Sequence, residues 1–351
     1  MRAPETSFYR ILPLTSIRFF AAIAIFLNHT LLFRAIPLVN QLEMPLLAFG
    51  YAGTTAFFIL SGFLLTAKYQ RSFQLHTFDW KHYFINRWKR IIPLHLLTLG
   101  ITIPFVVYEY GEQFWSLFVT NLLLLQSYIP SLQYAYSFNS VAWSLSALVF
   151  CWIAFPYMMR SMLRFHSLSA ILLLWMIEFV FVLFIATHEM TYFLLYISPI
   201  SRIVEFVTGM LLYRFFMSHP MTPHYTRPIT TALELESILV LCMSIFLVAY
   251  VPNAYRFSIF FLPSVSICIL LFSYARGSVS AWLSKKVFLF LGTISFEFIM
   301  FQLPMIRIFL DYVGVFFHAG YGIRLLLSFI ATFLISILYH AIAHPTKKLG
   351  I

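Results

Sequence analysis

The sequence predicts an all-α membrane protein of about ten transmembrane helices, and two observations carry this. First, 61% of the 351 residues are hydrophobic and only 10% are charged, whereas soluble globular proteins have roughly 45–50% apolar and about 25% charged residues. Second, at roughly 20 apolar residues per helical span, this share supplies about ten spans. The composition excludes a soluble enzyme, a disordered chain and a disulfide scaffold. We expect one integral membrane domain over residues 1–351, with no appended soluble domain.

Eleven apolar runs are candidate spans, and the charges between them favour ten. The run 114–129 is short and holds Asn121, Gln126 and Ser127. If it does not cross the membrane, all the basic clusters fall on the cytoplasmic side, as the positive-inside rule requires. We therefore expect 114–129 to be a short or re-entrant segment, covered by protein. The runs are 14–34, 46–67, 91–108, 114–129, 141–159, 168–187, 197–217, 233–251, 256–275, 287–309 and 322–341.

Basic residues also orient the chain and suggest a partner. Arg2, Arg10, Lys347 and Lys348 mark both termini as cytoplasmic in the ten-span topology. The net charge of +11 in a membrane protein indicates contact with anionic lipids rather than with nucleic acid. The three cysteines lie in apolar runs without metal-ligand spacing, so no metal site is predicted.

Two ionisable residues inside the first apolar run are the leading candidates for a functional site. Arg18 and His29 are eleven residues apart, which on a helix is about 20° beyond three full turns and about 16 Å along the axis. Both side chains therefore share one helix face. Taken singly, Arg18 could be a positive anchor at the membrane surface and His29 an interhelical hydrogen-bonding residue. Taken together, they suggest a site for a long ligand with an anionic end and a reactive end, such as acyl-coenzyme A.

Six motifs of the chain, which follow one another in the order found in the family, resemble those of the bacterial membrane acyltransferase family 3, the O-acetylases of surface polysaccharides. Arg18 and His29 reproduce the family's Arg-x10-His pattern. Five further segments are similar to family motifs: FFILSGFLLT (57–66), NRWKRIIPL (86–94), AWSLS (142–146), RIVEFVTGMLL (202–212) and LGTISFEFIMFQLPMIR (291–307).

The resemblance implies an activity and a set of site residues. The family takes an acyl group, usually acetyl, from cytoplasmic acyl-coenzyme A and passes it to a sugar hydroxyl on the far side of the membrane. His29 would be a general base or an acyl-carrying nucleophile. The arginines Arg18, Arg87 and Arg90 would bind the coenzyme's phosphates. For Arg87 and Arg90 the alternative is ordinary topology charge or lipid contact.

The same motifs offer contacts for the sugar acceptor, and these are Trp143, Ser144, Ser146 and Gln302. Trp143 could stack on a sugar ring or anchor the chain at the membrane interface. The aromatic and basic segment 69–90 predicts an amphipathic helix lying on anionic lipid, with lining of the coenzyme's access path as the alternative.

The chain departs from the family pattern at positions that bear on the chemistry. Leu148 stands where the family usually has an acid, Gln302 where it often has a histidine, and Thr15 and Phe19 replace an acid and a glycine near the start. Glu205, Glu297 or Gln302 could compensate for the acid that Leu148 replaces. Arg202 and Glu205 are within helical reach of one another and predict a structural ion pair.

These observations predict an acyl-coenzyme A:polysaccharide O-acetyltransferase of the bacterial cytoplasmic (inner) membrane. Its co-substrate would be acetyl-coenzyme A or another short acyl-coenzyme A, and its partners a saccharide acceptor and possible envelope polysaccharide assembly proteins. Two rivals stay open. One is a carrier or flippase of a glycan or lipid-linked sugar, and the other is an inactive family member that serves as an assembly subunit.

Overall fold

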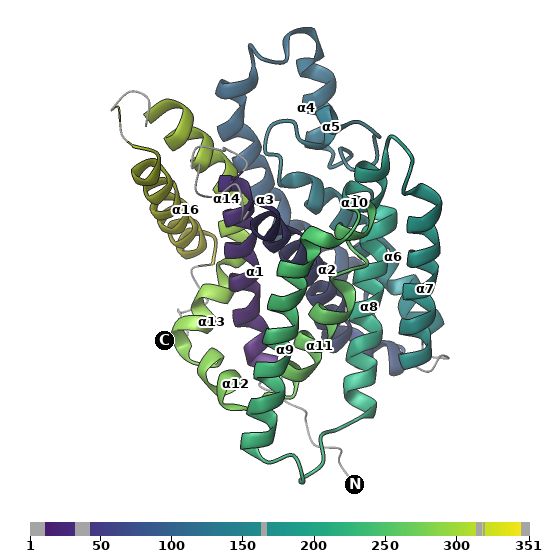
Figure 1. Cartoon of the computed structure of the whole chain (residues 1–351). Coiled ribbons are helices and arrows are strands. Elements are labelled where there is room, and N and C mark those ends of the chain that lie inside the picture. The colour runs from purple at the N-terminus through teal and green to yellow at the C-terminus, as the bar shows by residue number, and fades with distance from the viewer. Residues whose placement is uncertain (1–10, 32–42, 163–166, 314–317, 319, 345–351) are drawn as a thin grey trace.

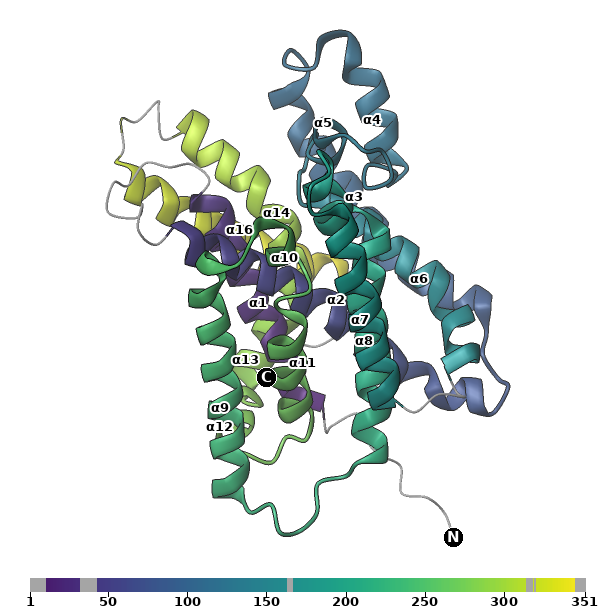
Figure 2. The same ribbon diagram turned by 45° about the vertical axis from the view of Figure 1, so that its right-hand side comes forward.

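The protein is a helical bundle with no strand among the residues that the computed structural model describes (Figures 1 and 2), which are 11–31, 43–162, 167–313, 318 and 320–344. Arg2, Arg10, Lys347 and Lys348, on which the cytoplasmic placement of both termini depends, lie outside these ranges. The small helices α4 and α5 lie at one end of the bundle and α12 lies at the opposite end (Figure 1).

The helices follow the apolar runs of the sequence closely. In the first half they are α1 Leu12–Leu31, α2 Glu43–Gln74, α3 Trp80–Val106, η3 Gly111–Gln113, α4 Phe114–Leu122, α5 Leu132–Ala135, α6 Ala142–Met162 and α7 Ser167–Ile185. In the second half they are η4 Phe193–Ile197, α8 Pro199–Ser218, α9 Arg227–Leu247, η5 Val248–Tyr250, α10 Asn253–Arg256, α11 Leu262–Ser273, α12 Ser278–Leu283, α13 Lys286–Thr293, α14 Ser295–Arg307, η6 Ile308–Val313 and α16 Tyr321–Ala343.

The all-α membrane fold is confirmed, but the count of ten spans is not. Within the described ranges, eight helices are long and apolar enough to cross a membrane, and the bent pair α13–α14 makes a ninth. The remaining run corresponds to α11, which has 12 residues where a span needs roughly 20. The run 114–129 does form a short element, because α4 has nine residues and ends at Leu122.

The segment 69–90 differs from the amphipathic surface helix that the sequence predicts. It is divided between the end of α2 and the start of α3, where Asp79 caps α3 by accepting a hydrogen bond from the backbone N–H of His82 at 3.0 Å. Its aromatic rings pack on one another and on α6: the ring centroids of Phe73 and Phe78 are 4.1 Å apart, and those of Tyr83 and Phe155 are 5.7 Å apart. The expectation of one helix over 69–90 is therefore wrong, whereas contact of the segment with lipid stays a prediction, since Trp88 is 40% exposed.

Helix α2 lies at the centre of the bundle, between α1 and α8 (Figure 2). The crossing of α2 and α8 is close because each helix places a glycine against the other's backbone. A Cβ atom on Gly62 would lie 1.9 Å from the Phe206 carbonyl oxygen, and one on Gly209 would lie 1.9 Å from the Ile59 carbonyl oxygen. Small residues that allow such close approach are typical of helix contacts in membranes.

The helix formed by α13 and α14 bends by 58° between Thr293 and Ser295. Just before the bend, Gly292 packs on the start of α1, where a Cβ atom would lie 2.0 Å from the Thr15 carbonyl oxygen. The bend directs α14 along α1, so the two helices face one another over the stretch that carries the candidate site.

Replacing Gly209 by alanine should destabilise the protein, because the added methyl group meets backbone that cannot move aside. Overpacking of this kind costs about 1–3 kcal/mol, measured as a lower midpoint of thermal unfolding in detergent. Gly100→Ala is the matched control, since a Cβ atom there has no neighbour within 4 Å. Equal effects of the two substitutions would contradict the close crossing.

Candidate active site

Three arginines predicted from the sequence come together in space. Arg18 projects from α1, and Arg87 and Arg90 lie in the first half of α3. Arg18 is close enough to both of the others for their charges to repel, and Arg87 and Arg90 repel one another in the same way. Among the described residues, Arg18 and Arg87 form no ion pair with a carboxylate. The cluster is therefore a site of unbalanced positive charge.

Aromatic rings hold the Arg87 guanidinium in place. It lies 5.9 Å from the Tyr69 ring centroid and 5.7 Å from those of Tyr83 and Trp152, distances at which cation–π attraction operates. The buried Nε of Arg87 has no hydrogen-bond partner in the described structure. Arg90 similarly lies 6.0 Å from the Phe296 ring of α14. The rings position the two guanidinium groups and leave hydrogen-bonding capacity for an anion.

Glu297 is the acid closest to this cluster. It lies on the first turn of α14, 4% exposed, and its charge acts on Arg90. One carboxylate oxygen is 2.9 Å from Nδ1 of His340 and 3.9 Å from Nε2 of His344, both near the end of α16. These three residues form a group with metal-ligand chemistry, but the 2.9 Å hydrogen bond already joins two of them. The expectation of no metal stays a prediction.

His29 lies at the other end of the same α1 face. Its imidazole is partly exposed, and its Nδ1 has no hydrogen-bond partner in the described structure. Gln302 of α14 approaches the ring, and neither its amide nitrogen nor its amide oxygen forms a standard hydrogen bond elsewhere. Of the three residues considered as substitutes for the acid replaced by Leu148, Gln302 is therefore the one beside His29. Glu205 and Glu297 have other partners.

A cavity of about 70 Å³ borders the face of α1 that carries Arg18 and His29, although neither of these two residues lines it. On α1 it contacts Ile25, which is seven residues after Arg18 and one helical turn before His29, and so lies on the same face. It also contacts Phe296, the ring beneath Arg90. The lining residues, from α1, α2, α6 and α14, are Ile25, Thr54, Phe57, Phe58, Ser61, Ser144, Leu145, Leu148, Phe296, Ile299 and Met300.

Of the predicted acceptor contacts on α6, the structure brings only Ser144 to this cavity. Ser146 is fully buried, and its hydroxyl donates to the Leu124 carbonyl oxygen at 2.6 Å and pairs with the Ser127 hydroxyl at 2.7 Å. Trp143 is 5% exposed and packs on Tyr196 with ring centroids 4.9 Å apart. Trp143 and Ser146 thus serve packing in this conformation, and their contact with a sugar stays a prediction.

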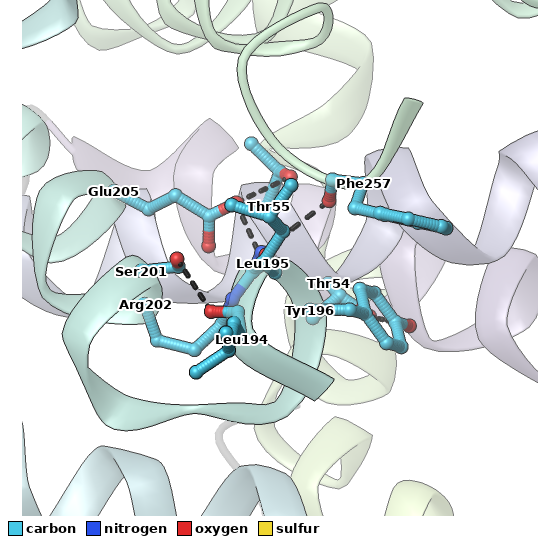
Figure 3. Close-up of polar contacts among 9 residues, drawn as sticks. All are labelled: Thr54, Thr55, Leu194, Leu195, Tyr196, Ser201, Arg202, Glu205 and Phe257. Carbon is cyan, nitrogen blue, oxygen red and sulfur yellow. Dashed lines mark hydrogen bonds and ion pairs between the residues drawn. The ribbon is translucent and has the colours of Figure 1, made fainter. Parts of the chain in front are cut away.

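The predicted Arg202–Glu205 ion pair is confirmed and forms the centre of a buried network (Figure 3). Arg202 Nη1 donates to Glu205 at 2.7 Å, and Nη2 donates to the backbone carbonyl oxygens of Leu195 and Phe257 at 2.8 and 3.3 Å. The Thr55 hydroxyl donates to the same carboxylate oxygen at 2.7 Å. The network ties α8 to α2 and to the loop before α11, and it fixes the α2 wall of the site.

Comparison with known proteins identifies the chain. Residues 14–341 match the model of the acyltransferase domain that defines acyltransferase family 3. The chain belongs to acyltransferase family 3. A stretch of 158 residues is 34% identical to the protein named acyltransferase MdmB of Streptomyces mycarofaciens, and it covers 43% of this chain. The match spans only 40% of the length of that curated relative. No solved structure matches the chain.

Membership of acyltransferase family 3 agrees with the geometry that the residues show independently. The arginines Arg18, Arg87 and Arg90 lie close together, and Arg18 and His29 share one face of α1. Sequence reasoning missed the apolar residues that line the cavity, since a leucine or phenylalanine beside a cavity has the same sequence pattern as one facing lipid. It named Glu297 only as a possible substitute for the acid that Leu148 replaces and did not predict its contact with His340.

Substituting Glu205 by glutamine should strongly destabilise the protein, because Arg202 is 0% exposed and would lose its counter-charge. Breaking a buried ion pair from one side costs about 3–5 kcal/mol, measured by thermal unfolding in detergent. Glu109→Gln breaks the more exposed pair with Arg307 and should cost about 0–1 kcal/mol. Equal losses would show that the buried network does not support the fold as described.

Proposed function

We propose that this protein is a membrane O-acyltransferase that takes a short acyl group, acetyl in the usual form of the family, from cytoplasmic acyl-coenzyme A. The acceptor is a hydroxyl group of a cell-envelope or exported polysaccharide. One observation carries the proposal: Arg18 and His29 lie on one face of α1, with the cavity-lining Ile25 between them in the chain and with Arg87 of α3 beside Arg18. Among the described residues, Arg18 and Arg87 have no carboxylate partner and Nδ1 of His29 has no hydrogen-bond partner.

The arginine cluster suits the phosphate end of the donor. Guanidinium groups bind phosphate oxygens through paired, charge-assisted hydrogen bonds. Such an anion would relieve the mutual repulsion of Arg18, Arg87 and Arg90. The separation of about 16 Å along the axis from Arg18 to His29 suits the pantetheine arm, which would place the thioester next to His29.

At the thioester, His29 supplies the proton transfer. As a general base it takes the proton of the acceptor hydroxyl while the hydroxyl oxygen bonds to the acyl carbon. The carbon–sulfur bond breaks, and the coenzyme leaves as a thiolate that then takes up a proton. As a nucleophile, His29 would first hold the acyl group itself and then pass it to the acceptor. Gln302 lies where it can orient the ring in either route.

The acceptor would approach from the outer side, where a polysaccharide crosses or leaves the bacterial inner membrane. Other envelope polysaccharide assembly proteins would be partners on that side, and anionic lipids would contact the basic residues on the cytoplasmic side. Two rival activities remain: a glycan carrier without chemistry, and an inactive assembly subunit, which the replacement of the family's acid by Leu148 favours.

The histidine assignment is tested with membranes that contain the protein and radiolabelled acetyl- or butyryl-coenzyme A. The wild type should label the envelope glycan, and His29→Ala should reduce labelling to background because the proposed proton transfer depends on the His29 imidazole. His224→Ala, an exposed histidine, should label normally. Transfer that survives in His29→Ala would remove His29 from the chemistry, and no transfer to any acceptor would favour a carrier.

The donor site is tested through the arginines. Arg18→Ala and Arg87→Ala should each raise the KM for acyl-coenzyme A by about tenfold or more, since a hydrogen bond to a charged group contributes about 1.5–3 kcal/mol. The exposed Arg276 provides a control, because its side chain binds the Thr222 carbonyl oxygen instead. An unchanged KM in the cluster variants would place the coenzyme elsewhere.

A further inference from the structure

The cavity beside Ile25 of α1 and Phe296 of α14 has a chemical character that bears on which acyl group the protein uses. Its walls are the side chains of Ile25, Phe57, Leu148, Ile299 and Met300, with further apolar neighbours. A thioester placed at His29 by the proposed donor path would lie one helical turn from Ile25. Its acyl tail would then turn into this cavity instead of continuing past His29.

The polar groups at the cavity are mostly engaged already. The Thr54 hydroxyl pairs with the Tyr196 hydroxyl at 3.2 Å. The Ser144 hydroxyl donates to the Val141 carbonyl oxygen at 2.8 Å. Ser61 is the remaining hydroxyl of the lining. A buried water needs two to four polar partners, so this surface suits an alkyl group better than water or a charged group.

The volume sets a size for that alkyl group. An engineered apolar cavity of about 150 Å³ binds benzene, which has six carbon atoms. On this scale, the cavity of about 70 Å³ accommodates roughly three carbon atoms. An acetyl group offers one methyl carbon beyond its carbonyl, whereas propionyl and butyryl groups offer two and three.

Leu148 makes this wall apolar. It lies one helical turn after Ser144 on α6, and both side chains are partly exposed on the face that lines the cavity. In the motif that this chain resembles, the position holds an acid, whose charge would be costly beside an alkyl chain. The substitution by leucine therefore changes this surface from one that repels a longer tail to one that buries it.

We infer that the cavity is an acyl subsite that selects three- and four-carbon acyl groups over acetyl, with Leu148 as a specificity-determining residue. The inference rests on the proposed function, because it requires a coenzyme A thioester as the donor. It changes the expected donor from acetyl-coenzyme A to propionyl- or butyryl-coenzyme A.

The test measures binding of coenzyme A, acetyl-, propionyl-, butyryl- and hexanoyl-coenzyme A to the full-length protein in detergent, by titration calorimetry. Butyryl-coenzyme A should bind about tenfold more tightly than acetyl-coenzyme A, since each buried methylene contributes about fourfold at 25 °C. Leu148→Phe, which fills the cavity, should remove the preference while acetyl-coenzyme A still binds. Leu148→Ala enlarges the cavity and should extend the preference for longer acyl groups to hexanoyl-coenzyme A.

Ile153→Phe is the matched control, because Ile153 lies on the same helix but is 47% exposed, and its preference should equal that of the wild type. Equal binding of all acyl donors, or tightest binding of acetyl-coenzyme A, would overturn the acyl subsite and leave the proposed function intact. Absence of binding by coenzyme A and all its thioesters would overturn both. A preference that is the same in wild type, Leu148→Phe and Leu148→Ala would overturn the role of Leu148.

Discussion

The structure depends on how arginine side chains are stabilised inside a protein that is surrounded by the apolar interior of a membrane. A buried charge is tolerated when a counter-charge and hydrogen bonds satisfy it, and Arg202 meets this condition through Glu205 and two backbone carbonyl oxygens. Arg18 and Arg87 have no carboxylate partner in the described part of the chain. The contrast separates an arginine that stabilises the fold from arginines that we propose bind an anionic ligand.

The backbone packing explains how this unbalanced charge is kept in place. The glycines Gly62 and Gly209 let α2 and α8 approach closely, and the buried Arg202 network joins the same two helices. On the other side, the bend between α13 and α14 brings Glu297 near Arg90 and Gln302 near His29. One rigid wall and one bent helix thus hold both ends of the proposed donor path.

Local sequence patterns predicted the elements better than their ends. Each apolar run became a helix, and the Arg18–His29 spacing placed both side chains on one face because helical geometry alone fixes that relation. The segment 69–90 was predicted wrongly as a single surface helix, since its pattern of aromatic and basic residues fits two environments. In the structure the segment is divided between α2 and α3, and its aromatic rings pack on one another and on α6. Hydropathy likewise marked the run of α11 without revealing that its helix is too short for a span.

By itself, the sequence determined that this is a membrane protein and to which family it belongs, because composition and motif spacing are properties of the chain alone. It also placed a cation and a titratable ring on one side of the first helix. Only the tertiary structure decided that Arg18 meets Arg87 and Arg90, that Gln302 rather than Glu205 or Glu297 lies beside His29, and that an apolar cavity borders this face of α1. These are contacts between helices distant in the chain, and they follow from helix crossings and a bend that no local pattern encodes.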